Sequence, residues 1–200
     1  MTEKERMEKG LIYDSAEPEL LKEQASYVKY MTEYNKLSLG DEKRMNELLP
    51  LMFAQVGEGT YIQPPFYANW GGHNVHIGEK VYANFDLTLV DDGHIYIGDR
   101  VMIAPNVTII TATHPISPRL REDALQYNVD VHIGRNVWIG AGAIILPGVT
   151  IGENSVIGAG SVVTRDIPPN VVAVGNPCRV MREISERDEI YYYKDRKIDI

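Results

Sequence analysis

The sequence predicts a mainly β fold, a parallel β-helix of hexapeptide repeats with a helical cap before it and a short segment after it. Two observations carry this prediction: a strict six-residue spacing of aliphatic residues, and a change from helical to strand periodicity near residue 60. We expect an α-helical region over residues 1–56, the β-helix over residues 57–180 with an extended loop at 111–130, and a C-terminal segment over residues 181–200.

The six-residue repeat runs without a gap in the second half of the chain. Its aliphatic positions are Ile133, Ile139, Ile145, Ile151, Ile157 and Val163, and four residues after each stand Val137, Ala143, Val149, Ser155, Ser161 and Ile167. Three hexapeptides joined by tight turns make one triangular coil, and stacked coils bury the aliphatic column. Chance alternation in a sandwich or barrel is the alternative, and six successive matches disfavour it. The spacing does not give the hand of the coil, since the usual crossover rule favours a right-handed one.

The first 55 residues carry helix signals instead of strand signals. Thr2 and Glu5 have the spacing of a capping box, Pro18 begins a second helix at a tolerated position, and Asp41 is expected to cap a third. Because a solenoid must cover its ends, we expect these helices to cap one end. The charged, tyrosine-rich residues 180–198 are expected to fold over the other end or over a neighbouring subunit.

Composition limits the partners of the protein. The net charge of −8 leaves no basic field for nucleic acid or an anionic membrane, so a polyanionic ligand needs a local cluster of cations. The single cysteine, Cys178, excludes an intrachain disulfide, and the charged N-terminal segment has no apolar signal region. These features predict a cytoplasmic protein, and no apolar run is long enough to cross a bilayer.

His114 is the outstanding candidate for a catalytic base. It lies in the loop 111–130, which interrupts the repeat, and long loops in regular arrays are often functional. An imidazole titrates near neutral pH, and Pro115 favours an extended backbone that projects the ring. We expect the loop to form a wall of the site for the substrate that accepts the transferred group. The alternatives are a ring that hydrogen-bonds a loop carbonyl and a loop that is a tolerated insertion.

The other histidines, His73, His76, His94 and His132, lack such a context, and for them structural roles are expected. Cys178 has no paired histidine beside it, so a covalent intermediate on its thiol is not expected, and direct attack in a ternary complex is the expected chemistry.

Several stretches of the chain resemble the sugar O-acetyltransferases typified by galactoside and maltose acetyltransferases. They are the hexapeptide array of residues 137–170, NFDLTLVDDG at 84–93, TATHP at 111–115 and GNPCRVMREI at 175–184. The resemblance covers nearly the whole chain, including the N-terminal helices. It implies a left-handed parallel β-helix, a homotrimer with active sites between adjacent subunits, and acetyl transfer from acetyl-CoA to a sugar hydroxyl, with no metal required.

The resemblance also implies roles for individual residues. His114 matches the catalytic histidine of the family. The matching sugar-binding positions are Asp14, Asn69, Asn84 and Asp92. Asn84 either binds sugar or orients the acetyl group, and turn chemistry is the alternative for Asp92. The matching coenzyme A contacts are Asn84, the Ala141 amide at the thioester oxygen, Ala159, Thr164 and Arg165.

The phosphates and the pantetheine arm of coenzyme A need different kinds of protein group. Its phosphates need local cations, and three arginines stand near the C-terminal end of the array: Arg165, Arg179 and Arg182. The small side chains of Ala141 and Ala159 leave backbone groups open to the amide-rich pantetheine arm. Trp138 either packs against this arm or faces a subunit seam.

Two rival functions and one choice of substrate stay open. A metal-dependent hydratase of the γ-carbonic-anhydrase kind uses the same solenoid with three histidines around zinc, but this chain lacks the close histidine pair beside the loop. A non-catalytic trimeric binding module is disfavoured by the set Asn84, Asp92 and His114. Residues 11–20 and 111–116 favour a maltose-type acceptor, and residues 191–198 favour a galactoside type.

Overall fold

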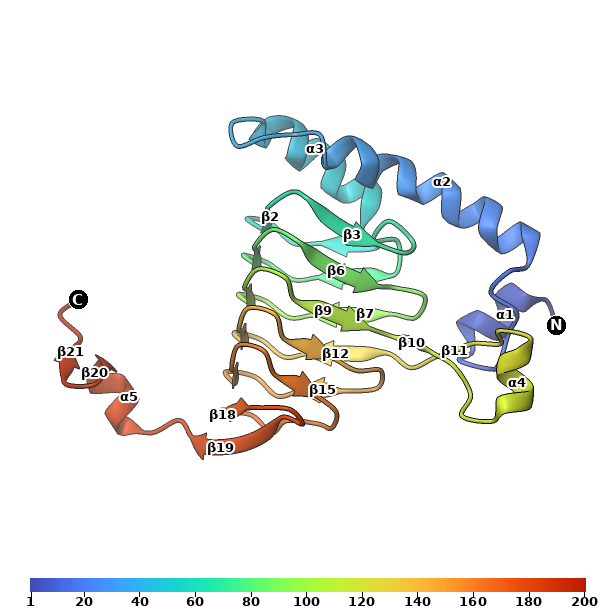
Figure 1. Cartoon of the computed structure of the whole chain (residues 1–200). Helices are drawn as coiled ribbons and strands as arrows, with labels where there is room; N and C mark the ends of the chain where they lie inside the picture. The colour runs from blue at the N-terminus through green and yellow to red at the C-terminus, as the bar shows by residue number, and fades with distance from the viewer.

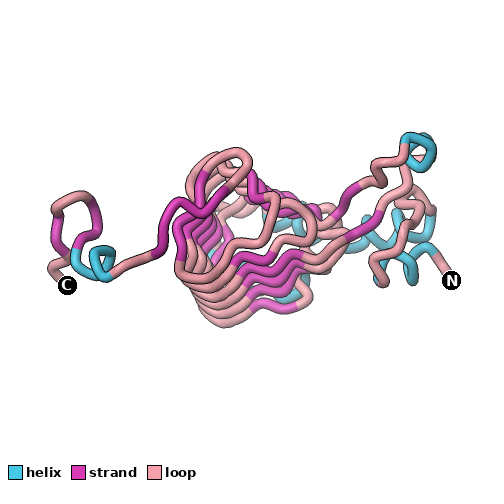
Figure 2. The backbone as a smooth tube through the Cα atoms, turned by 90° about the horizontal axis from the view of Figure 1, so that it is seen from below, coloured by secondary structure: helices cyan, strands magenta, loops and turns pink.

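A parallel β-helix of triangular cross-section forms the body of the molecule in the computed structural model, which describes residues 1–200 (Figures 1 and 2). Each coil contributes one short strand to each of three parallel sheets, termed sheets I, II and III in the order in which the chain passes through them. The prediction of a mainly β solenoid of stacked hexapeptides is therefore confirmed.

The three sheets contain the following strands. Sheet I holds β1 (Gln55–Val56), β4 (Val75–Ile77), β7 (Ile95–Ile97), β12 (Val131–Ile133) and β15 (Thr150–Ile151). Sheet II holds β2 (Tyr61–Ile62), β5 (Tyr82–Ala83), β8 (Met102–Ile103), β13 (Trp138–Ile139), β16 (Val156–Ile157), β18 (Val171–Val174) and β19 (Arg179–Glu183). Sheet III holds β3 (Phe66–Ala68), β6 (Leu87–Val90), β9 (Thr108–Ile110), β14 (Ile144–Ile145) and β17 (Val162–Val163).

The core is the aliphatic column that the repeat predicts. All six repeat positions from Ile133 to Val163 are buried, and they belong to one apolar cluster of 36 residues. Two serines of the repeat are also buried, and their hydroxyls are satisfied. Ser155 Oγ donates to the Pro168 carbonyl at 2.8 Å and accepts from the Val171 amide at 3.2 Å. A small polar residue is thus tolerated at this position because the next coil supplies its partners.

Two corners of the triangle position the functional residues. At corner II/III the chain turns from sheet II into sheet III, and at corner III/I it turns from sheet III into sheet I of the next coil. The turn at Gly140–Ala143 is at corner II/III. It has Gly142 at φ +67°, and the Ala143 amide donates to the Gly140 carbonyl at 3.3 Å. This is the geometry of a type II turn, which requires glycine at its third position.

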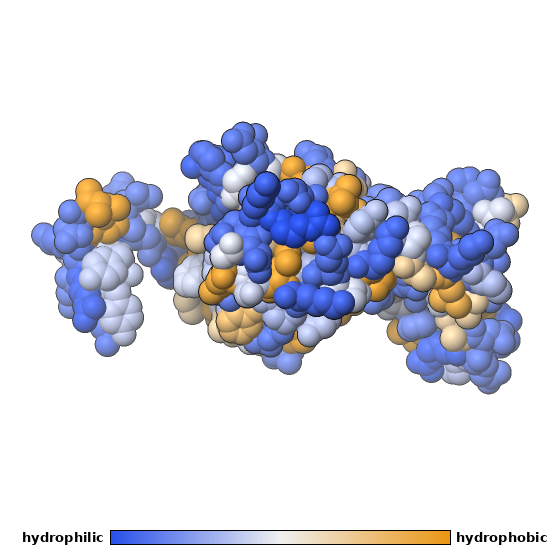
Figure 3. All heavy atoms as spheres, turned by 90° about the horizontal axis from the view of Figure 1, so that it is seen from above, coloured by the Kyte–Doolittle hydropathy of each residue, from blue (hydrophilic) through white to orange (hydrophobic).

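Helices α2 (Pro18–Tyr34) and α3 (Glu42–Met52) cover the N-terminal end of the solenoid (Figure 1). The Asn35 side chain fixes them to the first coil, since it donates to the Phe66 carbonyl at 2.6 Å and accepts from the Phe66 amide at 3.0 Å. Seen from above, the cap presents a mostly hydrophilic surface (Figure 3). Asp41 is the N-cap residue of α3, as predicted, but its carboxylate makes no cap bond to the helix and accepts instead from the Ser38 amide at 2.9 Å.

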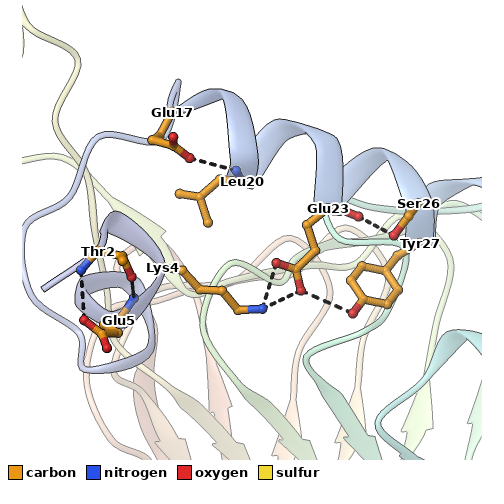
Figure 4. Close-up of polar contacts among 8 residues, drawn as sticks. All are labelled: Thr2, Lys4, Glu5, Glu17, Leu20, Glu23, Ser26 and Tyr27. Atoms are coloured by element: carbon orange, nitrogen blue, oxygen red, sulfur yellow. Dashed lines mark hydrogen bonds and ion pairs between the residues drawn. The ribbon is translucent and has the colours of Figure 1, made fainter.

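Helix α1 (Glu3–Glu8) lies beside the start of α2, and polar contacts hold the two together (Figure 4). The predicted capping box of Thr2 and Glu5 is confirmed. Lys4 Nζ lies 2.6 Å from a Glu23 carboxylate oxygen, and the Tyr27 hydroxyl donates to the same carboxylate at 3.4 Å. These contacts hold α1 against α2.

The C-terminal segment does not take the first of its two expected places, the end of its own solenoid, and cover of a neighbouring subunit stays a prediction. Strand β19 pairs antiparallel with β18, but α5 (Glu186–Ile190), β20 (Tyr191–Tyr193) and β21 (Arg196–Lys197) stand away from the solenoid (Figures 1 and 2). No residue after Cys178 is buried. The segment therefore does not cover the C-terminal end of its own coil. None of the five helices combines the length and apolar character needed to cross a membrane.

Candidate active site

The loop 111–130 is more ordered than its sequence suggests. It contains β10 (Ala112–Thr113), helix α4 (Pro118–Glu122) and β11 (Tyr127–Asn128), and the two strands pair as an antiparallel hairpin. Tyr13 adds a backbone bridge to Gln126, with N–O distances of 2.8 and 3.0 Å in the two directions. The loop projects from corner III/I, on the opposite side of the solenoid from the C-terminal segment (Figure 2).

His114 is exposed at the end of β10, and one hydrogen bond fixes its ring. Its Nδ1 lies 2.8 Å from the Leu125 carbonyl oxygen. Because a carbonyl only accepts, Nδ1 carries the proton, and the lone pair of Nε2 is left free. The two readings of His114 are therefore compatible, since the bond to a loop carbonyl is what orients a base. Continuing the β10–β11 register by one residue puts His114 opposite Gln126.

A polar pocket lies next to the hairpin. Asp92 is its centre: the carboxylate accepts from Asn69 Nδ2 at 2.9 Å and from Gln126 Nε2 at 3.0 Å. These three residues, with Tyr13 and Trp70, line a cavity of about 200 Å³. The predicted residues Asn69 and Asp92 are thus brought together, and Gln126 and Tyr13 join them without any sequence signal beyond their polarity.

Asp14 lies at the rim of this pocket. It is exposed, its carboxylate accepts from the Ala16 amide at 2.9 Å, and its neighbours Tyr13 and Ser15 line the cavity. The burial of Tyr13 and the nearby Asp92 raise the pKa of the Tyr13 hydroxyl well above its usual range. Tyr13 is therefore a neutral hydrogen-bonding group at any physiological pH.

The repeat explains why distant residues meet in this pocket. Asn69, Asp92 and the loop 111–130 follow β3, β6 and β9, which are successive strands of sheet III. Neighbouring strands of a sheet are about 4.8 Å apart, so the turns that follow them stack at corner III/I. Thr164 and Arg165 follow β17 at the same corner, two strands beyond β9 in sheet III.

A second set of predicted residues lies at corner II/III. Ala141 and Ala159 are exposed, and neither backbone amide has a hydrogen-bond acceptor in the chain. They stack in adjacent coils, since the Gly160 amide donates to the Ala141 carbonyl at 2.8 Å. Asn84 lies at this corner two coils towards the N-terminus, and its side-chain oxygen accepts from the Phe85 amide at 2.9 Å. This corner therefore offers free amide donors along an exposed edge.

The outer face of sheet II beside this corner is apolar. Trp138 in β13 is 50% exposed, and Met102 of the adjacent strand β8 is 46% exposed. Tyr82 of β5, the next strand, is 43% exposed. We term these three side chains the sheet II strip.

The three candidate cations do not form one cluster. Arg179 pairs with Val174 at the C-terminal end of corner II/III, and Arg165 lies at corner III/I. Arg182 makes a two-fold ion pair with Asp188, at 2.7 and 2.8 Å, and this pair lowers the pKa of the Asp188 carboxyl to about 2. The residues that the resemblance assigns to coenzyme A binding are thus distributed over two corners.

The remaining histidines pack against aromatic rings. His73 stacks on Tyr27 with centroids 3.7 Å apart, and His76 and His132 stack on the two faces of sheet I neighbour Tyr96 at 4.6 and 4.7 Å. His94 Nδ1 lies 3.1 Å from His76 Nε2. No group of three or more His, Cys, Asp or Glu side chains is arranged to hold a metal ion.

Cys178 is buried, and this burial raises the pKa of its thiol. A raised pKa disfavours the thiolate that covalent catalysis needs. The geometry therefore gives no support to an acetyl-cysteine intermediate.

Comparison with known proteins agrees with this geometry. The family description "Bacterial transferase hexapeptide (six repeats)" matches residues 130–165, and "Maltose acetyltransferase hexapeptide capping motif" matches residues 6–57. The galactoside O-acetyltransferase of Lactococcus lactis is 53% identical over 189 residues, which cover 94% of this chain and 91% of the relative.

Two solved structures are similar over almost their whole length. A galactoside acetyltransferase in complex with coenzyme A has a TM-score of 0.95 and 47% identity, and each chain is covered to 100%. A maltose O-acetyltransferase from Clostridium difficile 630 has a TM-score of 0.89 and 46% identity, with 92% of this chain and 98% of that chain covered.

The hexapeptide solenoid, the projecting histidine loop and the free corner amides together define a hexapeptide-repeat acyltransferase. At these levels of identity and coverage the assignment goes further. The chain belongs to the galactoside and maltose O-acetyltransferase family. The resemblance expected from the sequence and the enzyme class are confirmed, and the metal-dependent hydratase is the less favoured reading.

Proposed function

We propose that the protein transfers the acetyl group of acetyl-CoA to a hydroxyl of a pyranose sugar, with His114 as the general base. The orientation of His114 carries this proposal: Nδ1 is tied to the Leu125 carbonyl, and the register of the hairpin sets this residue opposite Gln126, which donates to Asp92 in the polar pocket. A similar enzyme binds coenzyme A in its solved structure, which supports the choice of donor.

The reaction follows from the free lone pair of His114 Nε2. The imidazole removes the proton of the sugar hydroxyl as its oxygen attacks the thioester carbon and forms the new C–O bond. The Ala141 amide, which has no acceptor in the chain, donates to the oxyanion. The C–S bond then breaks, and the imidazolium returns the proton to the departing thiolate, which leaves as the CoA thiol.

The positions of the two halves support a site between subunits. His114 and the acceptor pocket are at corner III/I, whereas Ala141, Ala159 and Asn84 are at corner II/III, on the other edge of sheet III. One chain does not place base and donor amides at the same edge. We therefore propose a cyclic homotrimer in which corner III/I of one subunit meets corner II/III of the next.

The sheet II strip supports this assembly. Tyr82, Met102 and Trp138 expose apolar surface directly beside corner II/III, and surface of this kind is typical of an interface. In the trimer the loop 111–130 of the neighbour covers this strip. In this proposed assembly Trp138 lies at the subunit seam and also beside the pantetheine arm, which combines the two alternatives for its role.

The donor site uses the predicted cations from both subunits. Ala159 donates its free amide to the pantetheine arm, Asn84 orients the acetyl group, and Arg179 lies at the same corner for a phosphate. Thr164 and Arg165 reach the arm from corner III/I of the neighbour. Arg182 meets a phosphate only when it exchanges its bonds with Asp188 for that phosphate.

The acceptor is a small sugar bound by Asp14, Asn69 and Asp92. A pocket with a carboxylate acceptor and amide donors suits vicinal hydroxyls. Whether maltose, glucose or a galactoside is the acceptor depends on which sugar places a hydroxyl at His114.

An acceptor panel tests this function. Purified protein with acetyl-CoA should release thiol when maltose, glucose or a galactoside is added, and NMR of the product should map the acetylated position. Release that no sugar stimulates would contradict the acceptor class. Sugar binding without any thiol release would favour a non-catalytic binding module.

A further inference from the structure

Asp91 is a buried carboxylate that the proposed mechanism does not use. Its side chain is completely buried, between the end of β6 and the acceptor residue Asp92. Its two oxygens accept from two backbone amides, that of Trp70 at 2.7 Å and that of Gly72 at 3.0 Å. The Asp91 carbonyl also accepts from the Asn74 side chain at 2.8 Å. One residue therefore binds the segment from Asn69 to Asn74 in three places.

The turn that Asp91 holds has no room to adjust. Gly71 and Gly72 have φ values of +64° and +96°, which favour glycine. A Cβ atom at Gly71 would lie 2.8 Å from the Tyr27 carbonyl oxygen, and one at Gly72 would lie 2.7 Å from the Phe53 ring. The turn is thus wedged between α2 and the residue after α3, and its amides point at a single carboxylate.

This turn carries a residue of the acceptor pocket. Asn69 directly precedes Trp70, and its side-chain amide donates to Asp92 at 2.9 Å. Asp91 therefore fixes Asn69 through the turn that it binds, and it directly precedes Asp92 in the sequence. A displacement of the turn would move Asn69 away from Asp92.

Stability alone does not account for a carboxylate at this place. Burial raises the pKa of Asp91 to about 7, against the lowering effect of the Trp70 amide, and the neighbouring Asp92 raises it further. A neutral side chain would avoid the desolvation of a charge. Costly buried groups of this kind are expected where a site needs a fixed geometry.

We infer that Asp91 is a positioning residue for the sugar acceptor, which clamps the Asn69–Gly72 turn and so sets the geometry of the Asn69–Asp92 pair. This inference rests on the proposed function, because it assigns the polar pocket to the acceptor. Asp91 touches neither substrate, so its effect should fall on acceptor binding and leave donor binding unchanged.

The test is the Asp91→Asn variant of the full chain. Asparagine keeps the size of the side chain but replaces one acceptor oxygen by a donor that faces an amide. We expect the KM for the sugar to rise about tenfold, as for the loss of one hydrogen bond to the Asp91 side chain, while the KM for acetyl-CoA stays within about twofold. We also expect faster hydrogen exchange at the Trp70 and Gly72 amides.

Thr60→Val is the matched control. Thr60 is buried and lies in the turn between β1 and β2. Its side chain bonds two backbone groups, the Gly78 carbonyl at 2.8 Å and the Val81 amide at 3.1 Å. It should lose similar stability without a change in either KM. The inference is overturned if Asp91→Asn leaves the sugar KM unchanged, or raises both KM values equally, as a merely structural residue would.

Failure of the proposed function gives a different result. In that case no sugar stimulates thiol release by the wild-type protein, whatever residue stands at position 91. Amide exchange tests the clamp independently: unchanged protection of Trp70 and Gly72 in Asp91→Asn overturns it.

Discussion

Replacing His114 by alanine is expected to lower kcat by about three orders of magnitude, within the range for a general base. The sugar hydroxyl is not ionised at neutral pH, and the free Nε2 of His114 is the base in the proposed mechanism. Alanine removes this base and the acid that protonates the departing thiolate. Thiol release at saturating sugar and acetyl-CoA measures the effect, and the unfolding midpoint should stay close to that of the wild type because the ring is exposed.

His132→Ala is the control for this experiment. His132 is also an exposed histidine, but its ring stacks on Tyr96 of sheet I and makes no hydrogen bond to the hairpin. We expect its kcat to stay within about twofold of the wild type, as for a surface residue that takes no part in the reaction. Wild-type kcat in His114→Ala would remove His114 from the mechanism.

Replacing Ala141 by proline is expected to lower kcat by about a hundredfold to a thousandfold, as for the loss of one oxyanion donor. Proline deletes the amide proton and keeps the carbonyl that accepts from Gly160. Ala141 is the second residue of a type II turn, a position that favours proline. The chain itself has Pro147 at the same place in the turn at Leu146–Val149, where Gly148 has φ +80°. The fold should therefore be preserved.

The Ala159→Pro variant distinguishes the loss of an amide that binds the pantetheine arm from the loss of the oxyanion donor. Its turn is closed in the same way, with the Ser161 amide donating to the Gly158 carbonyl at 3.3 Å. We expect the KM for acetyl-CoA to rise while kcat changes little, because this amide meets the arm and not the reacting carbon. Unchanged kcat in a stably folded Ala141→Pro variant would mean that another group holds the oxyanion.

The solenoid could be predicted because its signal repeats. From Ile133 to Val163 each hexapeptide sends the same kind of side chain into the core, so a single spacing specifies coil after coil. The helical cap was predictable in outline for the same reason, since Met45, Leu48, Leu49 and Met52 are buried as their spacing indicates. Asp41 takes the predicted N-cap position, but its carboxylate bonds to the Ser38 amide instead of to the helix, a competition that sequence does not resolve.

The site was only partly predictable, because its residues meet through the stacking of coils. His114, Asn69 and Asp92 carried recognisable motifs, but Gln126 and Tyr13 enter the pocket through a bridge between the N-terminal segment and the hairpin. Asp91 was hidden in a turn-like Asp-Asp-Gly sequence, and only its burial shows that it is a clamp. The ion pair of Arg182 with Asp188 likewise depends on a fold that the segment adopts outside the repeat.

The separation of base and donor amides has one further consequence. Within a chain, His114 and Ala141 lie at different corners of the triangle, so the proposed active site draws on two subunits. An inactive His114→Ala subunit still offers an intact donor corner, and an inactive Ala141→Pro subunit still offers an intact base.

Co-expression of these two variants tests the central claim most directly. Random assembly in a cyclic trimer gives about one quarter of the sites both intact residues, so thiol release should recover to about one quarter of the wild-type rate. The separately purified variants, assayed together without exchange of subunits, should remain inactive. A co-expressed mixture with no more activity than the separate variants would contradict a site shared between subunits.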